Sequence, residues 1–182
     1  MCISDIKSCK KCSICIHQEP LIDECTCCDG FWVGLSAKLS NTVKARPLDS
    51  STKSGSLLDE CEKSFDHIKM YRTNLVKCAP LTEQGKLRYP NEMEINSCLQ
   101  NLVDEIKELR PKIVILLGKR VEMAVGSYFG IKFEADGAFS YKCVIDDGIN
   151  YLSIQHPSYI NIYRRAYISD YIRGISDAVK NI

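Results

Sequence analysis

The chain has 182 residues, 45% of them hydrophobic, which is enough to enclose the core of one well-packed domain. Its formal net charge of +1 excludes a whole-protein field as the attraction for nucleic acid, so any such surface must be a local patch. The first residues lack the apolar core of a signal peptide and no apolar run approaches the length of a membrane span, so we expect a cytoplasmic protein with no membrane partner.

The N-terminal part of the chain differs in composition from the rest. Residues 1–29 are rich in cysteine and polar residues, which indicates a lead-in segment organised by a metal more than by an apolar core. Phe31–Leu35 is a short apolar run of the kind that forms a buried strand. The polar stretch from there to Lys53 predicts a long loop, and loops of that length in a compact domain usually carry function.

The remaining elements alternate between helices and strands. In chain order they are a helix over Gly55–Asp66 capped by Ser54, a strand over Met70–Val76, a helix over Glu92–Leu109, a strand over Lys112–Leu117, a helix over Lys119–Phe129, strands around Lys142–Ile145 and Tyr151–Ile154, and a helix over Tyr163–Asn181. This alternation predicts an α/β fold, a three-layer α/β/α sandwich with a central, mostly parallel four-stranded sheet. Residues 1–182 would form a single domain.

Four of the eleven cysteines have the spacing of a metal site. Cys9 and Cys12 form a local CxxC pair, Cys78 follows a predicted strand, and Cys98 lies in the next predicted helix. Four thiolates of mixed local and remote spacing can hold an iron–sulfur cluster or a zinc ion, and the pattern alone does not separate the two. Two alternatives stay open: Cys15, which overlaps Cys12 in a second CxxC, can replace one ligand, or the cysteines are simply buried.

Several segments occur together in the order of a known family. They are Cys9–Ile14 (CKKCSI), Trp32–Ala37 (WVGLSA), Arg46–Leu48 (RPL), Thr52–Gly55 (TKSG), Thr73–Pro80 (TNLVKCAP), Ile113–Gly118 (IVILLG) and His156–Asn161 (HPSYIN). This set resembles the iron–sulfur type of the uracil-DNA glycosylase superfamily, between its families 4 and 5. The resemblance covers nearly the whole chain.

The resemblance implies a function and a cofactor. The protein would be a DNA glycosylase that flips uracil or another deaminated or modified base out of single- or double-stranded DNA and hydrolyses its N-glycosidic bond. A [4Fe–4S] cluster, with zinc as the alternative, would be held by Cys9, Cys12, Cys78 and Cys98. The enzyme would be a monomer, and monofunctional, because no lysine occupies a motif position where it would obviously act as a Schiff-base nucleophile.

The same resemblance assigns roles to motif residues. His156 would donate a hydrogen bond to the departing base, Asn74 would read the base through its amide, and Asp49 would orient water. The ordinary structural alternative is a satisfied loop histidine for His156 and a strand-end turn residue for Asn74. The full set is His156, Asp49 and Asn161 for catalysis, Gly34, Leu35, Leu48, Asn74 and Ser158 for the base, and Arg164 and Arg165, otherwise a solvated helix face, for DNA phosphates.

Two substitutions depart from the family pattern. Leu35 stands where family 4 has the glutamate that activates water, and Leu48 stands where family 4 has an aromatic residue that stacks on the base. These changes keep a second hypothesis open, a catalytically weak base- or DNA-binding module on the same fold. A third is a zinc-stapled protein of unrelated function.

Overall fold

A five-stranded sheet organises the computed structural model, which describes residues 3–25, 27–39, 46–65, 67–134, 137–180 and 182. The strands lie in the order β2-β1-β3-β5-β4. Their bounds are β1 Gly30–Ser36, β2 Met70–Val76, β3 Ile113–Leu117, β4 Val144–Asp146 and β5 Ile149–Ile154. Four of them run parallel, and β4 pairs antiparallel with β5.

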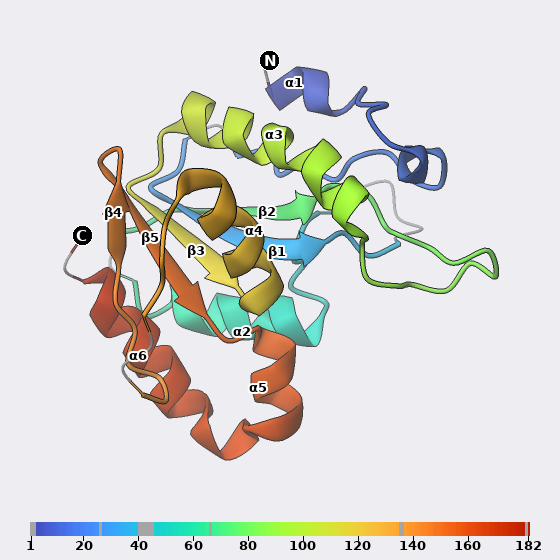
Figure 1. Ribbon diagram of the computed structural model, residues 1–182. Helices are drawn as coiled ribbons and strands as arrows, with labels where there is room; N and C mark the ends of the chain where they lie inside the picture. The colour runs from blue at the N-terminus through green and yellow to red at the C-terminus, as the bar shows by residue number, and fades with distance from the viewer. Residues whose placement is uncertain (1–2, 26, 40–45, 66, 135–136, 181) are drawn as a thin grey trace.

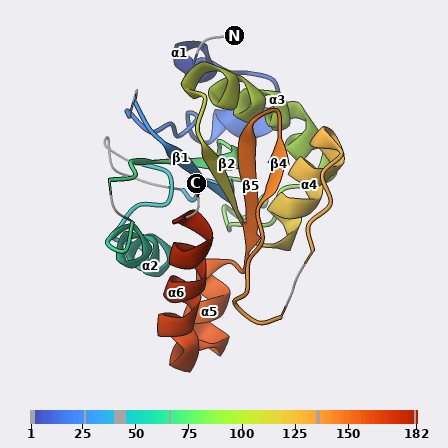
Figure 2. The same ribbon diagram turned by 90° about the vertical axis from the view of Figure 1, so that its left-hand side faces the viewer.

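The helices cover both faces of this sheet, which confirms the three-layer α/β/α prediction. They are α1 Ile3–Ile6, α2 Lys53–Glu62, α3 Glu92–Leu109, α4 Lys119–Phe129, α5 Pro157–Tyr163 and α6 Ile168–Val179. Figure 1 shows α1, α3 and α4 on one side of the sheet, and Figure 2 shows α2, α5 and α6 together on the other. Two apolar cores result, one between the sheet and α3 and α4, the other between the sheet and α2 and α6. Along β3, Val114 lies in the former and Ile113 and Ile115 lie in the latter, which is the two-residue alternation of a strand buried on both faces.

The predicted count of four strands is one short. Each of the five segments expected as strands does contain one, and the expected segment Lys142–Ile145 overlaps β4, a three-residue edge strand joined to β5 by a tight turn. Asp147 and Gly148 in this turn have φ of 47° and 76°, the positive values that a two-residue hairpin requires.

The helix predictions differ most at the ends. The helices α3 and α4 have the predicted bounds, and a capping box between Asn91 and Glu94 starts α3. Thr52, not Ser54, caps α2, because its side chain accepts from the Gly55 N–H at 3.0 Å. The predicted ends Asp66 and Asn181 lie outside the described residues.

The predicted C-terminal helix, Tyr163–Asn181, corresponds to α6 alone, and a helix that was not predicted, α5, precedes it. Pro157 begins α5, a 3-10 turn over Arg165–Tyr167 follows, and α6 begins at Ile168. A proline has no N–H to donate and its fixed φ suits the first helical position, so His156-Pro157 starts a helix of its own. No helix in the described part of the chain is long and apolar enough to cross a membrane.

The sheet brings the predicted motifs to one edge. Its four parallel strands end at Ser36, Val76, Leu117 and Ile154. After β1 the chain adds β2 on one side and β3 on the other, so the strand order reverses at β1. In open parallel sheets, ligands bind beside the carboxyl ends of the strands at such a reversal.

Candidate functional site

A cleft of about 970 Å³ lies at this edge of the sheet. Seven of the predicted site residues line it: Gly34, Leu35, Leu48, Asp49, Asn74, His156 and Ser158. They come from the ends of β1 and β2, the loop before α2 and the start of α5. The fold therefore joins segments more than a hundred residues apart in the sequence.

Asn74 carries a buried oxygen that has no hydrogen-bond partner among the described residues. Its side chain lies beside Gly34, its register partner in the pairing of β1 with β2. A Cβ at position 34 would lie 2.4 Å from Asn74 Oδ1, so only glycine leaves the amide this room. An unsatisfied buried acceptor costs about 1–3 kcal/mol, which a ligand donor would recover.

His156 is held as a neutral imidazole. It is the N-cap of α5, and its Nδ1 accepts a hydrogen bond from the Ser158 N–H at 3.1 Å. Burial lowers the pKa of His156, and the charge of Lys38 lowers it further. An accepting Nδ1 in a neutral ring places the proton on Nε2, so His156 offers an N–H donor to the cleft that it lines.

The wall formed by Leu48 and Asp49 is braced from behind. Leu48 has a φ of 51°, a left-handed conformation that is costly for a branched side chain. Arg72 Nη1 donates to the Leu48 carbonyl at 2.9 Å, and Arg72 also pairs with Asp59 and Glu62. A Cβ at Gly55 would lie 2.0 Å from the Asp49 carbonyl oxygen, so glycine permits this close approach of the loop to α2.

Asp49 brings a carboxylate to the cleft. Hydrogen bonds from the side chain and the N–H of Ser51 lower the pKa of Asp49, so it is ionised at neutral pH. Among the described residues that line the cleft it is the one acid. The other charged residues there are basic: Lys38, Arg46, Arg88, Lys119 and Arg120.

These basic residues form a local positive patch. With a net charge of only +1 for the whole chain, a site for a polyanion needs such a patch. Arg88 and Lys119 are partly neutralised by Glu94 and Glu122. Arg120 lies over the ring of Tyr89, 4.3 Å from its centroid. The rim of the cleft therefore offers positive charge together with an exposed aromatic ring.

Three of the predicted residues lie outside the set that lines the cleft. Asn161 Nδ2 donates to the Lys53 carbonyl at 2.9 Å, which ties α5 to the start of α2. Ser158 lines the cleft but also joins this clamp, with its Oγ 2.7 Å from Ser54 Oγ. Arg164 and Arg165 are exposed at the end of α5.

The predicted cysteine ligands converge at a second, small pocket. Cys9, Cys12, Cys78 and Cys98 line it together with Cys15. The apolar side chains of Ile14, Val76 and Ile95 pack around the thiols. Two N–H groups also approach the sulfurs: Asn101 Nδ2 lies 3.6 Å from those of Cys9 and Cys98, and the Lys77 N–H points at Cys98 Sγ at 3.4 Å. The fold thus brings the N-terminal segment against the end of β2 and one face of α3.

These residues fit a thiolate-bound metal group by donor type, because the cysteines line one pocket. Burial raises the pKa of Cys78 to about 12, so without a metal its thiol is neutral. Metal binding deprotonates such thiols, and amide N–H groups directed at sulfur stabilise the resulting thiolates. Within the described residues, no three His, Cys, Asp or Glu side chains stand in positions that would hold a metal ion.

Reasoning from the sequence missed Arg72 and Lys77. Both are charged residues inside or next to the apolar strand β2, and both side chains are buried. A charge within a buried strand is the signal that could have found them, because a buried charge must be paired. Arg120 and Tyr89 carried no such signal, because their pairing exists only in the fold.

Comparisons with known proteins identify a family and a fold. The model of the Uracil DNA glycosylase superfamily matches residues 34–178. A Type-4 uracil-DNA glycosylase from Pyrobaculum aerophilum is 34% identical over 74 residues, which cover 41% of this chain and 36% of that protein, so the match spans about a third of that relative's length. The crystal structure of wild-type Pedobacter heparinus SMUG2 has the same fold, with a TM-score of 0.55 and 14% identity over 85% of this chain and 75% of that chain.

Proposed function

Because the chain belongs to the uracil-DNA glycosylase superfamily, we propose that it is a monofunctional DNA glycosylase. It flips uracil or another deaminated or modified base out of DNA and hydrolyses the N-glycosidic bond. The observation that carries this proposal is the pair of polar groups in the cleft, the unpartnered Asn74 Oδ1 and the neutral His156 with its proton on Nε2.

The Asn74 amide complements the edge that deamination creates. Deamination converts an amino-substituted ring into one with an N–H next to a carbonyl, as in uracil, hypoxanthine and xanthine. A side-chain amide can accept from that N–H through Oδ1 and donate to that carbonyl through Nδ2. Cytosine presents an acceptor at the same ring nitrogen, which would leave the buried Oδ1 of Asn74 unsatisfied and so oppose its binding.

His156 and Asp49 would act on the two charges that develop when the bond breaks. The departing base becomes an anion, and a donated hydrogen bond from His156 Nε2 would stabilise the charge on its carbonyl oxygen. The sugar becomes an oxocarbenium-like cation, which the ionised Asp49 would stabilise while it orients the attacking water. Leu35, at the position of the family 4 glutamate, supplies no carboxylate, so Asp49 is the acid that remains among the described residues of the cleft.

DNA would be held by the basic rim of the cleft. Lys38, Arg46 and Arg120 can contact phosphates on either side of the extruded nucleotide, and such contacts position the strand without reading its sequence. Arg164 and Arg165 would extend this contact along α5, beside the exposed rings of Tyr159 and Tyr163, whose centroids lie 5.5 Å apart. Exposed rings next to cations suit the stacking of unpaired bases.

We further propose that Cys9, Cys12, Cys78 and Cys98 hold a [4Fe–4S] cluster, with zinc as the alternative. The four-sulfur donor set supports a soft metal or a cluster. When bound, the group would supply a structural crosslink between the N-terminal segment, β2 and α3. Iron, sulfide and zinc analysis of anaerobically purified protein distinguishes the two.

The test of the function is a panel of oligonucleotides, single- and double-stranded, that carry uracil, hypoxanthine, xanthine or hydroxymethylated cytosine. We expect release of at least one base with an N–H next to a carbonyl, and loss of that activity in His156→Ala. Release of no base from any substrate, with DNA binding retained, would reject the enzyme. It would favour the second candidate, a base- or DNA-binding module, for which Leu35 is the specific observation.

A further inference from the structure

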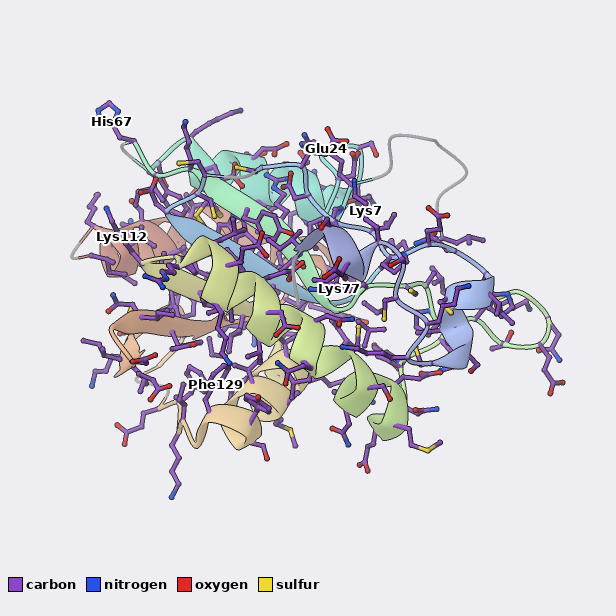
Figure 3. The ribbon with its side chains drawn as sticks, turned by 90° about the horizontal axis from the view of Figure 1, so that it is seen from above. Lys7, Glu24, His67, Lys77, Lys112 and Phe129 are labelled. Atoms are coloured by element: carbon purple, nitrogen blue, oxygen red, sulfur yellow. The ribbon has the colours of Figure 1, made fainter. Side chains whose placement is uncertain are left out.

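A fully buried ion pair lies between the cleft and the cysteine pocket. Lys77 Nζ is 2.5 Å from Glu105 Oε2, and both side chains have a relative exposure of 0%. Figure 3 shows Lys77 near the centre of the view, beside α3, whereas His67 projects from the periphery. Replacing a buried pair by apolar residues is often neutral or stabilising, so stability alone does not account for these two charges.

On one side the pair reaches the base-reading residue. Lys77 Nζ donates to the Asn74 carbonyl at 2.7 Å and to Thr73 Oγ1 at 2.6 Å. Because β2 is an edge strand, its outer carbonyl groups lack a neighbouring strand, and the lysine supplies a donor in its place. This bond fixes the peptide that follows Asn74, and with it the direction of the side chain whose Oδ1 has no partner.

On the other side the pair reaches the thiols. The Lys77 N–H points at Cys98 Sγ at 3.4 Å, and the next residue is Cys78. Glu105 lies two helical turns after Cys98 on α3, and it also accepts from Tyr71 and Thr73 of β2. The residues that hold the ammonium group thus lie on α3, which carries Cys98, and on β2, which ends two residues before Cys78.

We propose that Lys77, held by Glu105, is a positioning residue that makes the placement of Asn74 depend on the order of the cysteine site. Its effect on base recognition rests on the proposed function. Loss of the metal group would loosen β2 against α3, release the Asn74 carbonyl from Lys77, and weaken base discrimination before it weakens binding to DNA.

The decisive variant is the double substitution Lys77→Met/Glu105→Leu, which replaces both charges by apolar groups of similar size and so avoids a lone buried charge. Lys77→Met alone shows the effect of stranding Glu105. Lys112→Met is the matched control, because Lys112 makes an exposed ion pair with Asp29 at the far end of the sheet. Thermal unfolding and metal content per chain establish that each variant is folded and loaded.

The first readout is affinity for an oligonucleotide with 2′-fluoro-2′-deoxyuridine, in which fluorine resists cleavage by opposing positive charge on the sugar, against the same strand with 2′-fluoro-2′-deoxycytidine, whose ring nitrogen is an acceptor. We expect the preference for the uracil analogue to fall about tenfold in the double variant, the equivalent of one hydrogen bond, with binding of the cytidine strand unchanged. The second readout is amide hydrogen exchange over residues 73–78. Exchange there should become faster in the double variant and in wild type stripped of metal by a chelator.

A folded, loaded double variant with wild-type preference and wild-type exchange would overturn the inference. Failure of the proposed function is distinguishable, because it appears in the wild type as no preference and no base release. In that case the exchange measurement still decides whether the ion pair orders Asn74. The Lys112→Met control should match the wild type in every readout.

Discussion

Gly34→Ala should abolish base recognition while it leaves the fold intact. The added Cβ would lie 2.4 Å from Asn74 Oδ1 and 3.0 Å from Leu48 Cδ2, whereas ordinary contacts begin at 3.4 Å. The Asn74 oxygen must therefore move by about 1 Å, and a misplacement of that size in a reacting complex costs about 100-fold in rate. Because the atom that moves is the end of a side chain, we expect a loss of unfolding free energy of only about 1 kcal/mol.

Gly30→Ala is the matched control, because it places the same methyl group on the same strand. There the Cβ would meet the flexible end of Met70 at 2.7 Å and Ile113 Cγ2 at 2.8 Å, at the opposite end of β1 from the cleft. The assay is kcat/KM for release of the best base in the oligonucleotide panel, with thermal unfolding in parallel. Wild-type kcat/KM in Gly34→Ala, or an equal loss in Gly30→Ala, would refute the placement of Asn74 beside the base.

Three further predictions concern acidity, ligands and the reaction type. Burial lowers the pKa of His156, so as the pH falls below about 6.5 the unfolded chain binds more protons than the folded protein. The free energy of unfolding should therefore fall as the pH falls below about 6.5, and it should fall less in His156→Gln. Denaturant titrations that give the same pH dependence of this free energy in both proteins would reject the neutral buried ring. Cys98→Ser should lose the metal, whereas Cys15→Ser and the exposed control Cys27→Ser should keep it. If Cys15→Ser lost the metal and Cys27→Ser did not, Cys15 would replace Cys9 or Cys12 as a ligand. Borohydride should trap no covalent adduct with an abasic product, and an adduct that disappears in Lys38→Ala would show a lyase and end the monofunctional proposal.

Much of the fold follows from local pattern. The helices α3 and α4 have the predicted bounds because apolar residues at helical spacing and strong end signals agree over more than ten residues. The break before α6 escaped because it depends on a turn of three residues, in which packing outweighs periodicity. A helix of seven residues such as α5 has too few turns to show a period of its own.

The candidate site divides in the same way. Short motifs predicted that Asn74 and His156 share one site and that four cysteines share another, and these residues do line one cleft and one small pocket. The motif could not reveal that Asn161 ties α5 to α2, because its partner is the Lys53 carbonyl, 108 residues away. Nor could it find Arg72 as the brace behind Leu48, because that bond joins β2 to a loop more than twenty residues earlier.

By itself the sequence determined the main strands and helices, the cysteines that line one pocket and several of the residues that line the cleft, since propensity and chemistry are local properties. Only the tertiary structure decided that basic residues from four separate segments form the rim of one cleft in a protein of net charge +1. It also decided that a buried ion pair stands between that cleft and the thiols. Fields and hydrogen bonds act through space, over distances that position along the chain does not encode.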